Sequence, residues 1–109
     1  MKKLWINKPI AQPLTDFLKA YEITKKAQSA DEFMFLLTNG SGVSPTEVFE
    51  INVRDLEKLC EKANSENKKV ILFSPTEIEK PKSVYELSTM VAEDLISKKC
   101  KNYEIIRKI

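Results

Sequence analysis

The sequence predicts one α+β domain, in which a mixed or antiparallel sheet of four or five strands carries about three helices, largely on one face. Three observations support this prediction. The 109 residues suit a single compact domain, so residues 1–109 are treated as one unit. Short apolar runs typical of strands alternate with longer stretches of helical periodicity. The composition, 42% hydrophobic and 31% charged, is that of an ordinary globular protein.

The first part of the chain is expected to form a strand and then a helix. Residues 3–7 (KLWIN) alternate weakly between polar and apolar side chains, as a short strand does. The two prolines of the following KPIAQP predict an extended connection. A helix is predicted over about residues 14–27, because Leu14, Leu18 and Tyr21 fall on one helical face.

Residues 33–37 (FMFLL) allow two interpretations. Ser29 and Glu32 form the capping-box pattern that often begins a helix. Five apolar residues in a row, bounded by Asn39-Gly40, are instead typical of a buried central strand. We favour the strand because the run is short, and a helix over residues 30–38 is the alternative.

A second strand is predicted over residues 48–53, where apolar and polar side chains alternate. A helix with Asn52 as its N-cap then follows, and its apolar stripe extends to Ala63. Residues 70–73 (VILF) predict a buried strand.

The last third of the chain adds a helix and a strand. Ser83 and Glu86 form a capping box that begins the longest helix. Residues 103–109 alternate, and we expect them to form an edge strand. The resulting order, β-α-β-β-α-β-α-β, begins with the βαββαβ order of ferredoxin-like folds. We therefore expect a ferredoxin-like core with a helix and a strand added at its C-terminus.

The tetrapeptide SPTE occurs twice, beginning at Ser44 and at Ser74. Proline at the second position of a turn and serine at the first both favour a tight turn or the start of a helix. Internal duplication and phosphorylation of the Ser-Pro pairs are the alternatives. We favour two similar turns, because the sequences after the two copies soon diverge.

The absence of histidine narrows the chemistry that this chain can perform. Ser-His and Cys-His nucleophile pairs cannot form. Zinc sites that contain histidine are excluded, and two cysteines cannot make a four-cysteine site. Neither glycine belongs to a GxGxxG or GxxxxGK[ST] phosphate-binding pattern. The sequence therefore predicts a protein that is not an enzyme, and it assigns no catalytic residue, cofactor or metal ligand.

The two cysteines, Cys60 and Cys100, occur without a CxxC motif or a signal peptide, which is typical of a reducing, cytoplasmic setting. Cys60 lies on the apolar stripe of its helix and is predicted to be buried and inert. Cys100 stands among lysines and is predicted to be more exposed, with no resolving partner. No run approaches the ~18 apolar residues that span a membrane. The abundance of Lys, Ile, Asn and Glu favours a bacterial or phage source.

The leading functional hypothesis is a small protein-binding module, such as an inhibitor, an immunity-type protein or a phage-encoded modulator. The loop SPTEIEKPK follows a buried strand, and prolines that stiffen a loop suit it to recognition. An edge strand would also offer a surface for oligomerisation. The residues expected to contact a partner protein are Thr76, Glu77, Glu79, Lys80 and Lys82.

Two alternatives belong to other functional classes. One is a nucleic-acid-binding protein that uses the sheet face and a basic cluster near the C-terminus. The other is a magnesium-dependent enzyme built on carboxylates such as Glu86 and Glu93. Salt-dependent binding of nucleic acid, or stabilisation by metal, would distinguish them. The residues expected to contact nucleic acid are Trp5, Lys98, Lys99, Lys101 and Arg107.

Overall fold

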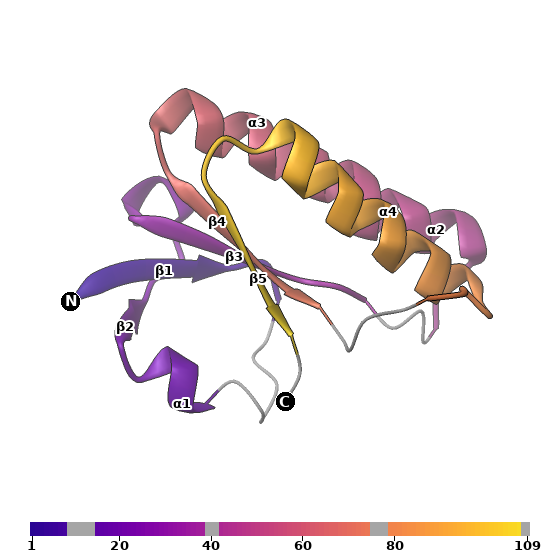
Figure 1. Ribbon diagram of the computed structural model, residues 1–109. Helices are drawn as coiled ribbons and strands as arrows, with labels where there is room; N and C mark the ends of the chain where they lie inside the picture. The colour runs from indigo at the N-terminus through magenta and orange to yellow at the C-terminus, as the bar shows by residue number, and fades with distance from the viewer. Residues whose placement is uncertain (9–14, 39–41, 75–78, 108–109) are drawn as a thin grey trace.

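Five strands form a single sheet in the order β2-β1-β3-β4-β5 (Figure 1). The computed structural model describes residues 1–8, 15–38, 42–74 and 79–107. The strands are β1 (Lys2–Ile6), β2 (Tyr21–Ile23), β3 (Glu32–Leu36), β4 (Lys69–Ser74) and β5 (Tyr103–Arg107). The α-helices are α1 (Thr15–Leu18), α2 (Pro45–Phe49), α3 (Leu56–Glu66) and α4 (Val84–Lys99). A π-helical segment, η3 (Glu50–Asp55), joins α2 to α3, and a 3₁₀ turn, η2 (Ala27–Ser29), precedes β3.

All four strand pairings are parallel, so the expected mixed or antiparallel sheet with a ferredoxin-like core is wrong. The chain has an α/β architecture. Strands β3 and β4 are apolar at successive positions because both of their faces are buried, as is usual in parallel sheets. Phe33 and Val70 pack on one face, whereas Met34 and Ile71 pack on the other.

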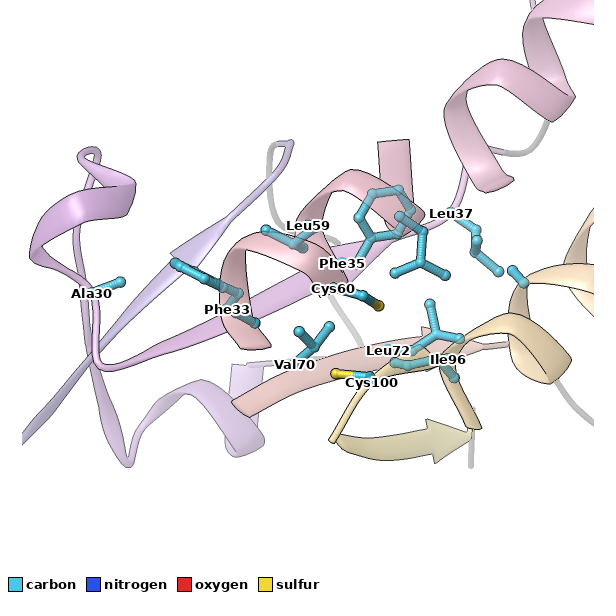
Figure 2. Close-up of a cluster of buried hydrophobic side chains, with 13 residues drawn as sticks. Ala30, Phe33, Phe35, Leu37, Leu59, Cys60, Val70, Leu72, Ile96 and Cys100 are labelled. Carbon is cyan, nitrogen blue, oxygen red and sulfur yellow. The ribbon is translucent and has the colours of Figure 1, made fainter. Parts of the chain in front are cut away.

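Helices cover the two faces of the sheet unequally. In Figure 1, α2, α3 and α4 lie together over one face, and the short α1 lies on the opposite side. The larger core cluster fills the space beneath α3 and α4 (Figure 2). The smaller cluster contains Leu4, Met34, Leu36 and Ile71, with Phe17 of α1 packed against it. In the described part of the chain, no helix is both long enough and apolar enough to cross a membrane.

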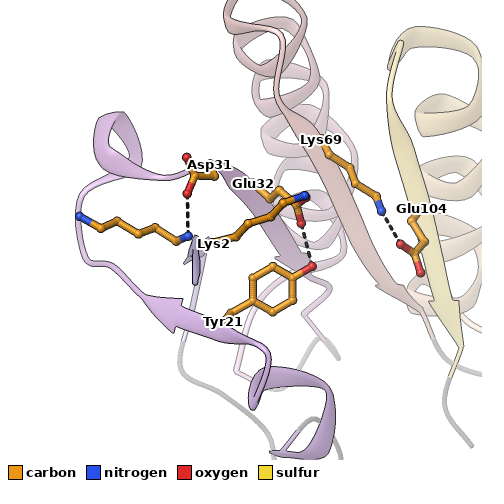
Figure 3. Close-up of polar contacts among 7 residues, drawn as sticks. Lys2, Tyr21, Asp31, Glu32, Lys69 and Glu104 are labelled. Carbon is orange, nitrogen blue, oxygen red and sulfur yellow. Dashed lines mark hydrogen bonds and ion pairs between the residues drawn. The ribbon is translucent and has the colours of Figure 1, made fainter.

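The predicted helix over residues 14–27 is wrong in its second half. Among the described residues of this range, only Thr15–Leu18 is α-helical, and Tyr21–Ile23 forms the edge strand β2. Tyr21 pairs with Lys2 in the parallel ladder, and its hydroxyl donates a 2.7 Å hydrogen bond to Glu32 Oε1 (Figure 3). Burial, and then the adjacent Glu32 carboxylate, raise the pKa of Tyr21 to about 12.

Hydrogen bonds and ion pairs connect the amino-terminal ends of neighbouring strands (Figure 3). Lys2 Nζ of β1 lies 3.0 Å from Glu32 Oε2 of β3, and Lys69 Nζ of β4 lies 2.6 Å from Glu104 Oε1 of β5. The Lys3 amide donates to Asp31 Oδ2 at 2.8 Å. These cross-strand contacts favour the observed register over one shifted by a residue.

The predicted strand over residues 48–53 is also wrong, because α2, η3 and α3 make one continuous helical stretch. The buried positions are Val48, Asn52 and Leu56, which lie at the four-residue spacing of one helical face. The alternation that suggested a strand arises because Ile51 and Val53, which flank this face, are both apolar and only half-buried. Asn52 is therefore inside the helical stretch and is not its N-cap.

Several predicted elements are confirmed. Strands form near the predicted positions at β1, β3, β4 and β5, so the strand was the correct choice for FMFLL, and β5 is an edge strand. The longest helix is α4, and its N-cap is Ser83, whose Oγ accepts a hydrogen bond from the Glu86 amide at 3.1 Å. Glu86 Oε1 in turn accepts from the Lys82 amide at 2.9 Å.

The two serines that begin the SPTE segments have different roles. Ser44 is the N-cap of α2, with its Oγ accepting from the Glu47 amide at 3.3 Å and Pro45 in the first turn. Ser74 is the last residue of β4 and is fully buried, and its hydroxyl donates to Glu93 Oε2 at 2.5 Å. Residues 75–77 lie outside the described residues. The first copy thus begins a helix, and the similarity of the two segments stays a prediction.

Candidate ligand-binding site

A cavity of about 620 Å³ opens beside the carboxyl-terminal ends of β1 and β3, on the face of the sheet that α3 covers. From β1 the chain continues to β2 on one side, and from β3 it continues to β4 on the other. The two strands are therefore neighbours whose connections diverge. In open parallel α/β sheets, ligands bind in the crevice at this point. The volume is within the range of ordinary small-molecule sites.

The short connection between β2 and β3 leaves this cavity open. All residues of that connection are described, and the only regular element in it is the single turn η2. A longer crossover would place a helix against β1 on this face. Instead the half-buried Trp5 lines the cavity, and its ring meets Phe33 edge-on, with centroids 6.0 Å apart and planes at 86°. The indole therefore presents apolar aromatic surface to the cavity.

Asn7 completes the hydrogen bonding of β3 at the floor of the cavity. Its Oδ1 accepts from the Leu36 amide at 2.7 Å, and its Nδ2 donates to the Leu36 carbonyl at 3.1 Å. The Asn7 amide also donates to the Met34 carbonyl at 3.3 Å. The side-chain amide of Asn7 thus makes the two hydrogen bonds to β3 that a further peptide unit of β1 would have made.

Asn52 provides the same two-point pairing from the helical side. Its Oδ1 accepts from the Thr38 amide at 2.8 Å, and its Nδ2 donates to the Thr38 carbonyl at 3.1 Å and to Ser88 Oγ at 3.0 Å. The side chain is fully buried and belongs to η3. The π-helical segment therefore directs an amide into the core, where it holds the end of the β3 segment against α4.

The charges that line the cavity are mainly positive. Lys8 follows β1, and Asp55, Lys58 and Lys62 lie at helical spacing on η3 and α3. Lys8 Nζ donates to the Leu37 carbonyl at 2.7 Å, and burial lowers the pKa of this lysine. Lys62 also pairs with Glu66 at 2.9 Å, but the lining itself has three lysines and one aspartate, which favours an anionic ligand.

A second polar cluster joins β4, β5 and α4. Glu93 accepts from Ser74 and receives a two-pronged ion pair from Arg107, with contacts of 2.9 and 2.6 Å. Burial acts to raise the pKa of Glu93, but the hydrogen bonds from Arg107 and Ser74 lower it below its usual value. Because both oxygens of the Glu93 carboxylate are already bound by Ser74 or Arg107, we assign this cluster a structural role and not ligand binding.

The Glu93 cluster predicts a loss of stability in acid. A carboxylate whose pKa is lower in the folded state stabilises the protein above its unfolded-state pKa, near 4.5, and this contribution is lost as the pH falls through the folded-state value. The free energy of unfolding, measured with urea, should therefore fall less between pH 7 and acid pH in Glu93→Gln than in the wild-type chain. Asp94→Asn, which removes an exposed carboxylate from the same helix, is the control for the loss of one negative charge. An unchanged pH dependence in Glu93→Gln would contradict the assignment.

No protein-family model matches the chain, and no curated protein matches it in sequence. Its fold does match solved structures. A proposed NAD-dependent epimerase/dehydratase from Bacillus halodurans has a TM-score of 0.76 at 15% identity, covering 98% of this chain and 70% of that chain. A dTDP-4-dehydrorhamnose reductase from Clostridium acetobutylicum has a TM-score of 0.71 at 14% identity, covering 98% and 52%. The ADP-L-glycero-D-manno-heptose-6-epimerase of Helicobacter pylori has a TM-score of 0.61 at 15% identity, covering 97% and 45%.

The fold is Rossmann-like. At these identities the likeness establishes the fold alone, and the chain spans only about half the length of two of the three proteins, 52% and 45%. The prediction of an inhibitor- or immunity-type module, which depended on the absence of histidine and of cofactor motifs, is contradicted because the matching folds are those of epimerases and reductases. The prediction that the protein is not an enzyme is contradicted by the same comparison, since the matching structures carry the names of enzymes.

A Rossmann fold raises the question of whether the chain fits a dinucleotide in the usual way. That mode needs a glycine-rich turn after the first strand, because the backbone must approach the pyrophosphate closely at a helix amino terminus. Here β1 is followed by Asn7, Lys8 and the sequence PIAQPL, which contains no glycine, and the described part of α1 has four residues. The chain's two glycines, Gly40 and Gly42, instead follow β3. These residues do not fit the usual pyrophosphate-binding turn.

The residues predicted to contact a protein partner lie before α4. Glu79, Lys80 and Lys82 are exposed there, whereas Thr76 and Glu77 lie outside the described residues. Of the described residues, Glu79, Lys80 and Lys82 do not line the cavity.

The residues predicted to contact nucleic acid are not brought together. Trp5 lies on β1, whereas Lys98, Lys99 and Lys101 are exposed near the amino-terminal end of β5. Arg107 lies at the opposite end of β5 and is paired with Glu93. Strands β3 and β4 separate Trp5 from all of them.

The carboxylates considered for magnesium also have other roles. Glu86 belongs to the capping box of α4, and Glu93 is bound by Ser74 and Arg107. Among the residues that the structure describes, no three metal-binding side chains of the Cys, Asp or Glu type come together.

Sequence reasoning recognised Trp5 but missed the other residues of the cavity. Asp55, Lys58 and Lys62 recur at three- and four-residue spacing, so their common face was readable once the helix was accepted. Asn7 and Asn52 had no readable signal, because their partners are backbone groups about 30 and 14 residues away.

Proposed function

We propose that the protein binds a nucleotide, an aromatic base joined to phosphate groups, in the cavity between β1 and α3. The observation that carries this proposal is the position of Trp5 beside three lysines at the point where the β1 and β3 connections diverge. A ligand that combines a planar ring with negative charge is complementary to both features.

The aromatic part of the ligand would lie against Trp5. Stacking of a base on an aromatic side chain contributes ~1–3 kcal/mol and tolerates different bases, because every base has a π-face. Phe35, Ile51 and Leu59 supply the remaining apolar surface of the cavity. The ring of Trp5 is held by its edge-on contact with Phe33, so little ordering is needed on binding.

The phosphate groups would lie against the lysines. Lys58 and Lys62 project from α3, and Lys8 approaches from the end of β1. The partial burial of Lys8 disfavours its charged form, so a phosphate placed beside it would compensate for the lost hydration. This mode differs from a glycine-turn site because side-chain ammonium groups, and not backbone amides, neutralise the phosphates.

The names of the similar enzymes support a ligand of this class. They contain NAD, dTDP or ADP, each of which is a nucleotide. Because two of these names denote a nucleotide-linked sugar, a nucleoside-diphosphate sugar is the form of the ligand closest to those proteins.

The proposal is tested by calorimetric titration of the full chain with ADP, dTDP, NAD and a dTDP-linked sugar. The single tryptophan gives an independent fluorescence signal from inside the cavity. Lys58→Ala and Lys62→Ala should each weaken ADP binding about tenfold, which corresponds to ~1.4 kcal/mol.

Lys98→Ala is the matched control. Like Lys62, Lys98 makes an i,i+4 ion pair on a helix surface, but it lies near the end of α4 and does not line the cavity. Affinity should be unchanged in this variant. Binding that is absent in the wild-type chain, or that all three variants weaken equally, would refute the proposal.

A further inference from the structure

Cys60 and Cys100 come from different parts of the chain and both belong to the main core cluster. Cys60 lies on α3 and is fully buried, whereas Cys100 directly follows α4 and is 6% exposed. Both belong to the cluster between the sheet and the helices, where Figure 2 shows Cys60 above Val70 and Cys100 below it. The expectation of an exposed Cys100 is therefore wrong. Two thiols so placed are candidates for a covalent bond between two helices.

The two thiols have different acidities. The Cys60 side chain is the largest cause that lowers the pKa of Cys100, assisted by backbone groups of Asn102 and Val70. The Cys100 side chain, together with burial and the nearby Glu57 and Glu61, raises the pKa of Cys60. Cys100 is thus the more acidic thiol, and in its neutral form its Sγ donates to the Asn102 carbonyl at 3.3 Å. A thiolate with residual access to solvent is the form that reacts with oxidants.

We propose that Cys60 and Cys100 form a reversible disulfide that joins α3 to the end of α4 when the protein meets a peroxide. In the first step, the Cys100 thiolate attacks one oxygen of hydrogen peroxide, the O–O bond breaks, and the leaving hydroxide takes up a proton to become water. Cys100 is then a sulfenic acid. In the second step, the Cys60 sulfur attacks Sγ of Cys100, the S–S bond forms, and the hydroxyl group leaves as a second water with the proton of the Cys60 thiol. Two electrons pass from the thiols to the peroxide.

This bond would have a direct structural consequence. It would close the chain segment that contains β4 and α4 into a covalent loop, which restricts the unfolded state. The oxidised protein should therefore unfold at a higher temperature than the reduced protein. The inference does not depend on nucleotide binding, because neither cysteine lines the cavity.

The experiment exposes the full-length reduced chain to hydrogen peroxide, removes the excess with catalase, and alkylates the remaining thiols under denaturing conditions. Intact-mass measurement should show a monomer that has lost two hydrogen atoms and both alkylation sites. A proteolytic digest should contain one cross-linked pair of peptides, carrying Cys60 and Cys100, and dithiothreitol should separate them. The melting temperature should rise on oxidation and return on reduction.

Single variants test the order of the two steps. In Cys60→Ser, Cys100 should stop at the sulfenic acid and be labelled by dimedone, whereas in Cys100→Ser the buried Cys60 should remain a free thiol. The wild-type measurement stands even if a variant fails to fold. Two alkylatable thiols after peroxide treatment, or a disulfide only between different molecules, would overturn the proposal.

Discussion

Replacement of Asn52 with alanine is expected to destabilise the protein by about 3 kcal/mol, because each buried polar group left without a partner costs ~1–3 kcal/mol. The truncation would remove both contacts to the backbone of Thr38 and the contact to Ser88. Asn52 is fully buried, so water cannot readily replace the lost amide. Thermal unfolding should show a fall in Tm of roughly 15 °C, at the ~4–8 °C per kcal/mol typical of domains near this size.

Asn64→Ala is the matched control for Asn52. The Asn64 side chain also bridges two backbone groups, donating to the Lys99 carbonyl at 2.7 Å and accepting from the Lys101 amide at 2.9 Å. This site is exposed to water, so its loss should cost less than ~1 kcal/mol. Equal effects of the two substitutions would contradict the role given to burial at Asn52.

Replacement of Trp5 with alanine is expected to weaken ADP binding by tenfold or more, since a stacked base contributes ~1–3 kcal/mol. Trp5→Phe keeps an aromatic surface and should retain most of the affinity. Calorimetric titration measures both variants, because the fluorescence signal disappears with the indole. The measurement is made well below the Tm of each variant, since Trp5 also packs against Phe33.

Tyr103→Ala provides the comparison for Trp5. Tyr103 is an aromatic residue, 39% exposed, on the edge strand β5, away from the cavity. Its loss should leave ADP affinity unchanged. If Trp5→Ala binds ADP as tightly as this control does, the base does not stack on Trp5 and the proposed orientation of the ligand is wrong.

The function expected from the composition differs from the function that the structure supports. Without histidine or a glycine-rich motif, the sequence favoured a binding module and gave no reason to expect an enzyme-like fold. The Rossmann-like sheet places its cavity at the carboxyl ends of β1 and β3 whatever side chains line it, since the position follows from the divergence of the connections. The ligand class then depends on Trp5 and the lysines, and only the fold brings them together.

The sequence by itself determined the elements whose signals are local. The apolar runs of β3 and β4, the capping box that begins α4 at Ser83, and the alternation in β5 could all be predicted, because propensity, capping and periodicity act within a few residues. Even the predicted order of strands and helices agrees with the observed order. It does so by coincidence, with a false strand at residues 48–53 and with Tyr21–Ile23 missed.

Only the tertiary structure decided how these elements pair. Strand β2 has three residues and is held by its ladder with β1 and by the contact between Tyr21 and Glu32, neither of which leaves a local pattern. Residues 48–53 carry both a two-residue and a four-residue periodicity, and packing of Val48 and Asn52 into the core selects the helix. Parallel pairing depends on contacts between residues distant in the chain, so the same elements are compatible with a mixed sheet until those contacts form.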